Sequence, residues 1–398
     1  MLFQSGQLFF CILLFITVFV VCKWVFRKGW LNNVVLLLGN ALILTNLVRP
    51  QSMLILLIVA TVCYGAGVLL QRKKWRWLLA LTLALLIALF AIRSYPLVWK
   101  WFGEFWTTNM KKPFFSVEKL GLSYILFRLI HWLVECRRGT LRTHDFLTYV
   151  NYLFFFPTFM AGPIDTLNNF HYWMHATRVR FNARMLLAGV GRIFLGAVKT
   201  LLIVPLMLPY ATDYQTLLPN MGPWSAVICA ALLYTLYIYI DFSGYCDLAI
   251  GMAYMMGIRT PENFNNPYLS ANIAEFWKRW HITFSTFLKI YVFKPVIGFL
   301  NRFSIRKWRM TVSVIAYMLT FFVCGLWHGC TLNFVIWGLW HGLGLSLYKI
   351  GIGIHPPKPT RLNRVLGIVA TFLFVTVGWI FFNYPMDELS NMINLLFG

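Results

Sequence analysis

Long apolar stretches, separated by short polar segments, follow one another along most of the chain. Runs close to the roughly 20 residues that cross a bilayer lie near 7–22, 34–48, 53–70, 77–93, 185–208, 224–240, 310–326, 333–350 and 365–383. Shorter or interrupted apolar stretches near 119–135, 147–164, 243–257 and 281–300 are further spans or re-entrant pieces. The pattern predicts an all-α polytopic membrane protein with about ten to twelve spans.

Polar residues interrupt the hydrophobic pattern unevenly. Residues 1–112 are mostly plain apolar spans and resemble a scaffold, whereas Pro, Gly, Asn, charged residues and nearly all histidines lie in 113–350. Functional groups in membranes concentrate where ionisable residues and broken helices occur. We therefore expect a single transmembrane domain over 1–398, with a catalytic core at 113–350 and a last helix and tail at 351–398.

Composition and charge support the membrane assignment and indicate an orientation. The chain is 60% hydrophobic and 12% charged, with a net charge of +23. Basic clusters at 23–28 and 72–76 follow the first and third spans, which places both loops in the cytoplasm and the N-terminus outside. The first run lacks a cleavage site and is predicted to be a retained helix. The scattered basic residues suit lipid headgroups or an acidic partner, and they disfavour nucleic acid.

Cysteine and histidine spacing offers a weak metal signal. Cys324 and His328 are spaced i,i+4, with Cys330 two residues further on, and His171 and His175 share the i,i+4 spacing. No carboxylate or second ligand pair lies nearby in the sequence, whereas zinc sites have three or four defined ligands. We predict no metal site, and the cysteines are predicted to be small buried hydrophobic residues without a disulfide framework.

The pentapeptide "GLWHG" occurs twice, at 325–329 and 338–342. On one unbroken helix, His328 and His341 would lie ~220° apart around the axis and ~20 Å apart along it, too far to serve one reacting atom. The intervening "GCTLN" has the small and polar residues of a helix end. We therefore predict His328 at the C-terminus of one span and His341 inside the next. A lone histidine of this kind is more often a hydrogen-bonded structural group than a catalyst.

The longest polar segment, 259–309, contains a third candidate histidine. "NIAEFWKRWHITFSTFLKIYVF" is predicted to be one helix capped by Ser270, with Glu275 and Arg279 at i,i+4. His281 follows Arg279 closely and precedes hydroxyl residues that include Ser285. Imidazole suits base catalysis near neutral pH, but a nucleophilic serine needs a base within reach, which spacing cannot establish. The alternative is a surface helix in the headgroup layer, anchored by tryptophans.

Two carboxylates are deeply embedded in the apolar sequence "YIYIDFSGYCDLAIG", namely Asp241 and Asp247. A carboxylate inside a membrane must be paired, protonated or hydrated. A salt bridge, or a helix break at Ser243–Gly244, explains these residues at least as well as catalysis does.

Three motifs resemble those of the membrane-bound O-acyltransferases. They are "FFFPTFMAGPID" (154–165), "DFSGYCDLAIGMAYMMGIRTPENFNNPYLSANIAEFWKRWHITFSTF" (241–287) and "GLWHG" (325–329). Within that superfamily the chain is most similar to the D-alanyl transfer proteins of the teichoic acid pathway, and the alginate O-acetylases are close relatives. The resemblance implies a ring of about 11 transmembrane helices, with re-entrant and short helices, around a central funnel and tunnel.

The resemblance also implies roles for individual residues. His328 matches the catalytic histidine and would act as general base on the acceptor hydroxyl, without an acyl-enzyme. His281 lies near the same tunnel, and either it or Asn272 would orient or polarise the carbonyl. His341 matches a mostly structural position. Further residues expected at the tunnel or substrate are Asn272, Trp277, Trp280, Ser285, Trp327 and Asp241.

The implied reaction carries an acyl group across the bacterial cytoplasmic membrane. The expected donor is a D-alanyl phosphopantetheine thioester on an acidic carrier protein, with acetyl-CoA as the other possibility and no bound cofactor. The acceptor is a hydroxyl of an envelope polymer or of an extracytoplasmic partner protein. Two alternatives remain open: O-acetylation of an exported polysaccharide, and a non-catalytic transporter or flippase. The carrier is expected to dock on Lys278, Arg279, Arg302, Arg306, Lys307 and Arg309.

Overall fold

The computed structural model describes residues 6–26, 28–94, 119–141, 145–175, 183–354 and 360–397. Within these ranges every regular element is a helix, which confirms the all-α prediction. Chain contacts separate two compact units: unit 1 comprises Met1–Gly196 and Tyr245–Pro261, and unit 2 comprises Ala197–Gly244 and Glu262–Gly398. The single domain expected from the sequence, and the ring of helices, stay predictions.

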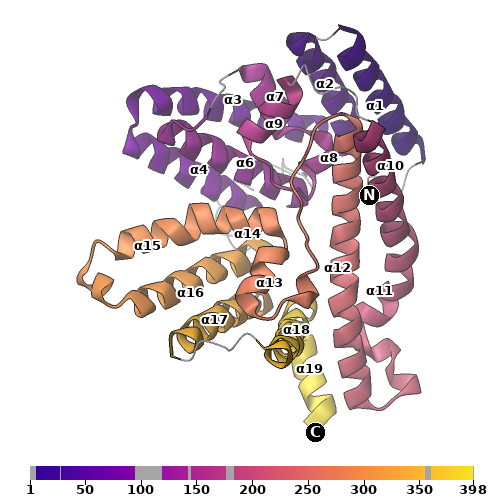
Figure 1. Cartoon of the computed structure of the whole chain (residues 1–398), viewed down its shortest axis with the longest axis vertical. Coiled ribbons are helices and arrows are strands. Elements are labelled where there is room, and N and C mark those ends of the chain that lie inside the picture. Colours follow the sequence, from indigo (N-terminus) through magenta and orange to yellow (C-terminus); the bar gives the residue numbers. More distant parts are fainter. Residues whose placement is uncertain are drawn as a thin grey trace, which may run out of the picture. The chain divides into compact units, whose positions relative to one another are not determined.

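Figure 1 shows the helices of both units. In unit 1 they are α1 (Gly6–Phe26), α2 (Gly29–Leu44), α3 (Pro50–Lys73), α4 (Arg76–Ser94), α6 (Lys119–Arg138), α7 (Phe146–Leu153), α8 (Phe156–Phe159), α9 (Leu167–His175) and most of α10 (Ala183–Ala197). A π-helical stretch (Val198–Ile203) continues α10 into α11 (Val204–Thr212). The C-terminal part of α12 (Pro223–Met255) belongs to unit 1 and the rest to unit 2. The remaining α-helices are α13 (Ile273–Arg279), α14 (Ile282–Leu288), α15 (Lys294–Leu300), α16 (Arg309–His328), α17 (Leu332–Ile354), α18 (Arg361–Asn383) and α19 (Met386–Phe397). Short 3₁₀ turns lie at Tyr214–Thr216, Leu218–Asn220, Pro267–Leu269 and Ser304–Lys307.

Six of the described helices are long and apolar enough to cross a membrane: Pro50–Lys73, Ala183–Thr212, Pro223–Met255, Ile282–Leu300, Arg309–His328 and Arg361–Asn383. Shorter apolar helices occupy Gln7–Lys23, Gly29–Leu44 and Arg76–Ala91. The separate spans predicted at 224–240 and 243–257 are one continuous helix, α12, so the helix break predicted at Ser243–Gly244 is wrong. The stretch 147–164 holds only the short helices α7 and α8.

Buried asparagines hold α2 of unit 1 against α7 and α8. Asn33 donates to the Thr148 hydroxyl at 3.0 Å, and Asn40 donates to the Asn151 side chain at 3.2 Å. The side-chain oxygen of Asn40 also accepts a hydrogen bond from the Phe156 backbone N–H at 3.1 Å. Each bond gives an apolar helix a polar partner that lipid could not supply. The expectation of an almost wholly apolar scaffold in this half is therefore wrong.

One buried and one part-buried cation of unit 1 bind backbone carbonyl groups. The Arg128 guanidinium on α6 donates to the carbonyl oxygens of Tyr152, Leu153 and Thr158 at 2.7–2.8 Å. Lys23, predicted to be a cytoplasmic loop charge, instead lies part-buried and donates to the Trp173 carbonyl at 3.2 Å. These bonds compensate the desolvation of each charge and fix the irregular backbone around α7 to α9.

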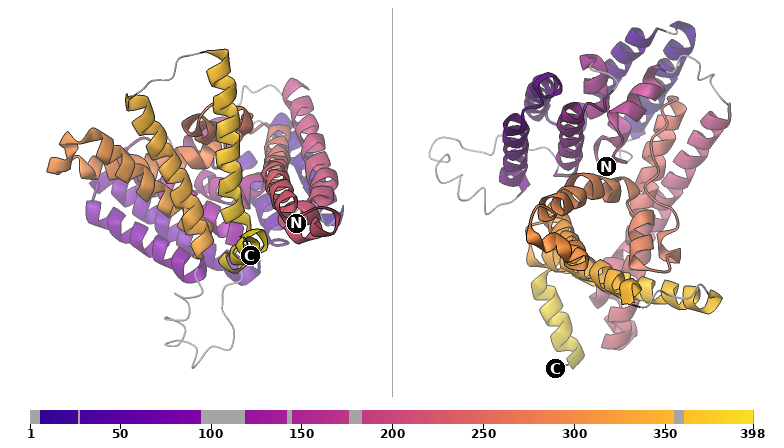
Figure 2. Two further views of the ribbon diagram at one scale, coloured as in Figure 1. Left: turned by 90° about the horizontal axis from the view of Figure 1, so that it is seen from below. Right: turned by 60° about the vertical axis from the view of Figure 1, so that its left-hand side comes forward.

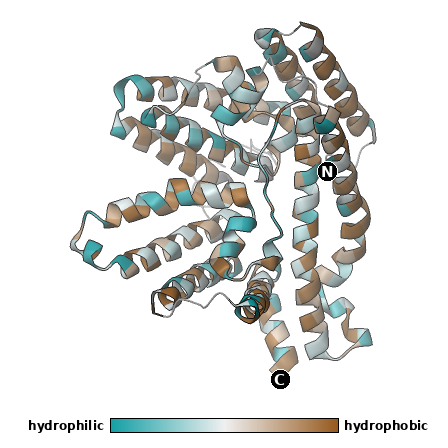
Figure 3. Ribbon diagram, viewed as in Figure 1, coloured by the Kyte–Doolittle hydropathy of each residue, from teal (hydrophilic) through white to brown (hydrophobic). Residues whose placement is uncertain are grey.

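A helical hairpin positions the two most reactive candidate histidines of unit 2. Its first leg, Ile282–Leu300, begins directly after His281, and its second leg, α16, ends at His328. Figures 1 and 2 show the legs side by side, joined by the turn between α15 and α16. Each leg is about 30 Å long at about 1.5 Å per residue. The hairpin therefore brings both histidines to one end and leaves the turn, which carries hydrophilic residues in Figure 3, at the other.

The repeated pentapeptide marks the crossing of α16 and α17. A Cβ on Gly338, the first glycine of the second copy, would overlap the Phe321 carbonyl oxygen and lie 3.1 Å from the Gly325 backbone. A Cβ on Gly325, the first glycine of the first copy, would overlap the Phe334 carbonyl oxygen. Small residues allow such close helix packing in membranes. The shared glycines face one another's helices, and as predicted His328 ends one helix while His341 lies inside the next.

Gly338→Ala is expected to destabilise the protein, because the added methyl group meets backbone atoms that cannot rotate away. Overpacking of this kind costs about 1–3 kcal/mol. Gly351 is the matched control, since it lies on the same helix with open space around its Cα. Gly351→Ala should be neutral or stabilising by up to about 1 kcal/mol. Thermal unfolding of both variants in detergent tests this, and equal midpoints would contradict the proposed crossing.

Candidate active site

A capped helix, α13, leads into the site of unit 2. Asn272 is its N-cap, with its side-chain oxygen accepting from the Glu275 backbone at 2.8 Å, while the Glu275 carboxylate accepts from the Ala271 backbone at 2.8 Å. This differs from a capping box in one respect, because the glutamate accepts from the residue before the N-cap and not from the N-cap itself. The cap predicted at Ser270 is wrong, and the Glu275–Arg279 pair is confirmed at 2.6 Å. The side-chain amide oxygen of Asn272 is thus engaged in capping α13.

The single helix predicted across this segment is broken at His281. His281 has φ 40° and ψ 53°, a left-handed conformation that is uncommon for a residue with a side chain. The preceding loop holds this turn, because the Ile282 backbone donates to the Asn263 carbonyl at 2.9 Å and the Asn265 backbone donates to the Arg279 carbonyl at 3.0 Å. Strained residues persist only when their surroundings determine them, and they cluster at functional sites.

Asn263 also fixes the orientation of the His281 ring. Its side-chain oxygen accepts from the Thr283 backbone at 3.2 Å and lies 3.4 Å from His281 Nδ1. The same oxygen accepts from the Thr283 hydroxyl at 2.6 Å, so Asn263 ties the residue after the left-handed turn to the preceding loop. Burial, and after it the nearby His328, holds the pKa of His281 well below its usual range.

His328 lies at the end of α16 within a group of aromatic rings. Its ring centroid is 4.5 Å from Trp327, 4.9 Å from Trp337 and 4.9 Å from Phe382. The side chain is half-buried, whereas His281 is 4% exposed and His341 is fully buried. The Phe284 ring lies near two of these histidines. Its centroid is 4.9 Å from the His281 ring and 6.4 Å from the His328 ring.

His341 occupies a closed aromatic environment. Its ring lies 5.1 Å from both Trp277 and Trp337. Within the described ranges neither ring nitrogen has a hydrogen-bond partner, so the expectation of a hydrogen-bonded histidine is wrong. A Cβ on Gly378 of α18 would lie 2.9 Å from Nε2, so only glycine leaves room for the ring there.

The structure brings some of the other candidate residues to the histidines and separates others. Trp277 packs edge-on to the His341 ring, and Trp327 contacts His328. Trp280 packs 5.0 Å from Trp379, and the Ser285 hydroxyl donates to the Trp280 carbonyl at 3.1 Å, which engages its proton. Asp241 is exposed on α12, and the embedded carboxylate is instead Asp247, which pairs with Arg192 at 2.5 Å.

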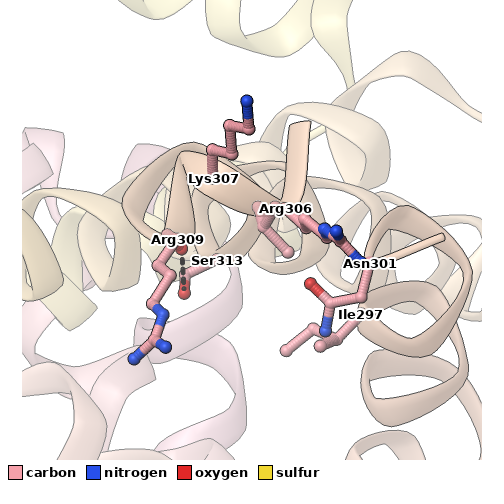
Figure 4. Close-up of a pocket in the computed structure, with 7 residues that line it drawn as sticks. Ile297, Asn301, Arg306, Lys307, Arg309 and Ser313 are labelled. Atoms are coloured by element: carbon pink, nitrogen blue, oxygen red, sulfur yellow. Dashed lines mark hydrogen bonds between the residues drawn. The ribbon is translucent and has the colours of Figure 1, made fainter. Parts of the chain in front are cut away.

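The six predicted docking residues fall at both ends of the hairpin. Lys278 and Arg279 are on α13, close to His281 in sequence, while the other four lie in or next to the α15–α16 turn. A cavity of about 780 Å³ opens at that turn (Figure 4). The side chains of Lys307 and Arg309 point in different directions there, so the charges do not converge on one point. Its lining residues are Ile297, Asn301, Arg306, Lys307, Arg309, Val312 and Ser313.

A half-buried histidine beside an oriented second histidine suits acid–base chemistry on a hydroxyl. Residues 59–386, most of the chain, match the family model of MBOAT, the membrane-bound O-acyltransferase family. The chain belongs to this family. It is therefore a multi-pass membrane O-acyltransferase, and the resemblance of its three motifs to those of the family is confirmed.

The curated relatives act on different polymers by name. The chain is 32% identical over 285 residues to the teichoic acid D-alanyltransferase of Bacillus subtilis, covering 68% of this chain and 70% of that protein. It is 34% identical over 269 residues to the probable alginate O-acetylase AlgI of Pseudomonas aeruginosa, covering 66% and 48%. It is 34% identical over 247 residues to the peptidoglycan O-acetyltransferase of Helicobacter pylori, covering 60% and 44%. The matches span about half the length of these two acetylating relatives.

Sequence reasoning missed three contributors to the site. Asn263 was not singled out in the sequence, yet its side chain contacts a histidine ring 18 residues later. Phe284 and Trp337 were not singled out among the many aromatic residues. Trp337 lies four residues before His341, so their shared helix face was a signal in the sequence.

Asn263→Ala should lower both thermal stability and turnover, because its side-chain oxygen accepts from Thr283 and faces His281. Each buried donor left without a partner costs about 1–3 kcal/mol. Asn265, whose side chain is exposed in the same loop, is the control, and Asn265→Ala should change neither property. Unfolding midpoints and acyl-transfer assays test both variants. Wild-type turnover in Asn263→Ala would show that the His281 orientation does not matter.

Proposed function

We propose that the protein transfers an acyl group from a thioester to a hydroxyl of a cell-envelope polymer, with His328 as the general base. The supporting observation is exposure: His328 is the one of three clustered histidines that keeps an accessible side chain. A general base must come within hydrogen-bond reach of the proton that it removes. His281 and His341 are too deeply buried to meet a polymer hydroxyl without rearrangement.

In the proposed step, His328 accepts the hydroxyl proton as the hydroxyl oxygen attacks the thioester carbonyl carbon. The tetrahedral intermediate then collapses, the carbon–sulfur bond breaks, and the imidazolium returns its proton to the leaving thiolate. His281, whose Nδ1 lies 3.4 Å from the Asn263 side-chain oxygen, shares the Phe284 ring contact with His328 and helps to position the base. No acyl-enzyme is needed, which agrees with the Ser285 hydroxyl being engaged by a backbone carbonyl.

The favoured acyl group is D-alanyl, delivered as a phosphopantetheine thioester on a carrier protein, with a teichoic acid or an extracytoplasmic partner protein as acceptor. The match to the Bacillus subtilis teichoic acid D-alanyltransferase covers 70% of that protein, against 48% of the alginate relative. The exposed basic turn also suits an acidic carrier. The membrane would be the bacterial cytoplasmic membrane, with the turn on the cytoplasmic side.

O-acetylation from a small donor such as acetyl-CoA is the second candidate. It is favoured by the 34% identities to alginate and peptidoglycan acetylating relatives. The two candidates differ in the mass that they add to the polymer. Mass spectrometry of envelope polymers from cells with and without the protein separates them directly.

The hairpin length limits what the basic turn can do for a carrier. A phosphopantetheine arm of about 14 bonds extends to about 16 Å, at the ~3.5 Å per three bonds of an extended chain. Each hairpin leg is about 30 Å long. A carrier seated only at the turn would therefore leave its thioester far from His328. We infer that the four basic residues near the turn attract the carrier but do not by themselves place its thioester at His328.

His328→Ala should reduce acyl transfer by about 10²–10⁴-fold, the usual loss on removing a general base. Its half-buried position predicts little change in folding. Ester content of the polymer, measured alongside the amount of folded protein in the membrane, gives both quantities. Normal acylation with His328→Ala would exclude His328 as the base.

His341→Ala should instead lower stability before it lowers activity per folded molecule, because it leaves a cavity among packed aromatic rings. The same two measurements apply to it. A well-folded but inactive His341→Ala protein would assign the chemistry to the second pentapeptide.

Reversing Arg306, Lys307 and Arg309 to Glu should slow transfer from a carrier at low salt while leaving turnover at saturating carrier unchanged. Exposed charges act mainly on encounter rate, and salt screens them. The wild-type advantage should therefore shrink as ionic strength rises, as measured with purified protein in lipid nanodiscs. A correctly inserted variant with wild-type rates at low salt would leave these charges with a topological role only.

A further inference from the structure

One face of α17 carries a line of buried polar atoms without partners. Asn333, Trp337 and His341 follow one another at intervals of four residues, about one helical turn. Among the described residues, Asn333 Oδ1, Trp337 Nε1 and both His341 ring nitrogens lack a hydrogen-bond partner. Buried polar groups are rarely left this way in native proteins, and each exception needs an explanation such as a ligand or a catalytic role.

Trp337 is the member of this line that contacts His328. Its ring lies 4.9 Å from the His328 ring at an interplanar angle of 85°, and 5.1 Å from the His341 ring. The side chain is 1% exposed. The neighbouring residue, Gly338, packs against the backbone of α16, so the position of the indole relative to α16 is fixed by main-chain contact. A fixed donor of this kind needs no reorganisation during a reaction.

We propose that the Trp337 indole N–H donates a hydrogen bond to the acyl carbonyl oxygen as that oxygen becomes an oxyanion. The inference rests on the proposed acyl transfer at His328. When the hydroxyl oxygen bonds to the carbonyl carbon and its proton moves to His328, the carbonyl electron pair shifts to this oxygen. The N–H stabilises that charge until the carbonyl re-forms, the carbon–sulfur bond breaks, and the thiolate receives the proton from the imidazolium.

Neighbouring donors fit this role less well. The Trp340 indole N–H already donates to the Phe374 carbonyl at 3.0 Å. The Trp277 N–H has no partner in the described ranges, but its ring lies against His341 and Phe321. His341 itself contacts Trp337, which in turn contacts the base. The Trp327 ring lies nearer His328, at 4.5 Å, and packs 4.4 Å from Phe284. Of the two indoles beside the base, Trp337 is the one that also belongs to the buried polar line of α17.

The test compares Trp337→Phe with Trp340→Phe, two equal truncations on one helix. Trp337→Phe removes a donor that has no protein partner, whereas Trp340→Phe breaks a hydrogen bond to backbone. Trp337→Phe should therefore lose less thermal stability than Trp340→Phe, yet lose about 10²–10³-fold in kcat, as expected for one oxyanion donor. Trp340→Phe should keep wild-type kcat per folded molecule. KM for the donor should change little in Trp337→Phe, since the bond strengthens only with the developing charge.

Purified full-length protein is assayed with D-alanyl-loaded carrier protein, and in a parallel arm with acetyl-CoA. If Trp337→Phe does not fold, replacing Trp337 with β-(3-benzothienyl)alanine keeps the bicyclic shape without an N–H and should show the same loss of kcat. Wild-type kcat in Trp337→Phe or in the benzothienylalanine variant would overturn the proposal. An equal loss of kcat in Trp340→Phe would also overturn it. The two hypotheses remain distinguishable, because an active His328→Ala protein refutes the base assignment, whereas an inactive His328→Ala with an active Trp337→Phe refutes only the indole donor.

Discussion

Polar groups inside a membrane protein must find their partners within the protein, because hydrocarbon offers none. In unit 1 this constraint is largely met by backbone carbonyls and amides. Arg128 donates to three carbonyl oxygens, and the asparagines of α2 bond to α7 and α8. These bonds tie apolar helices to irregular segments that could not otherwise be stable at membrane depth. Among the described residues, both units contain buried polar atoms without partners, including Asn32 Oδ1 and Arg128 Nε in unit 1. In unit 2 such atoms follow one face of α17 at Trp337 and His341, and Trp337 contacts the half-buried His328. An unpartnered N–H donor beside a base, as at Trp337 and His328, is an arrangement that a reaction site requires.

Two backbone features place the groups of the site. The hairpin of Ile282–Leu300 and α16 returns the chain to its starting point, so residues 281 and 328 meet although they are far apart in sequence. The glycines of the repeated pentapeptide then let α17 pack closely on α16, which brings Trp337 to His328. The repeat therefore encodes one helix crossing, and its two histidines differ because one ends a helix while the other is enclosed.

Local signals in the sequence predicted the helices, the end of α16 at His328 and the placement of His341 within α17. They worked because apolar length and small polar residues at a helix end act locally. The break at His281 was missed because no proline or glycine marks it, and the bonds from Asn263 that hold it come from a separate loop. Conversely, a helix break was predicted at Ser243 and Gly244, but α12 continues through both residues. The role of Trp337 depends on ring contacts between helices, which no single-helix pattern contains.

Chemical modification of the histidines tests the central claim most directly, namely that His328 alone is both accessible and required. Purified protein is treated with diethylpyrocarbonate, and modified histidines are mapped by mass spectrometry as acyl-transfer activity is followed. The assignment of His328 as the base predicts that activity falls in proportion to modification of His328, that His281 and His341 stay unmodified while the protein is folded, and that bound donor slows the reaction. Activity that persists with His328 fully modified, or that falls in step with His281 or His341 instead, would contradict it.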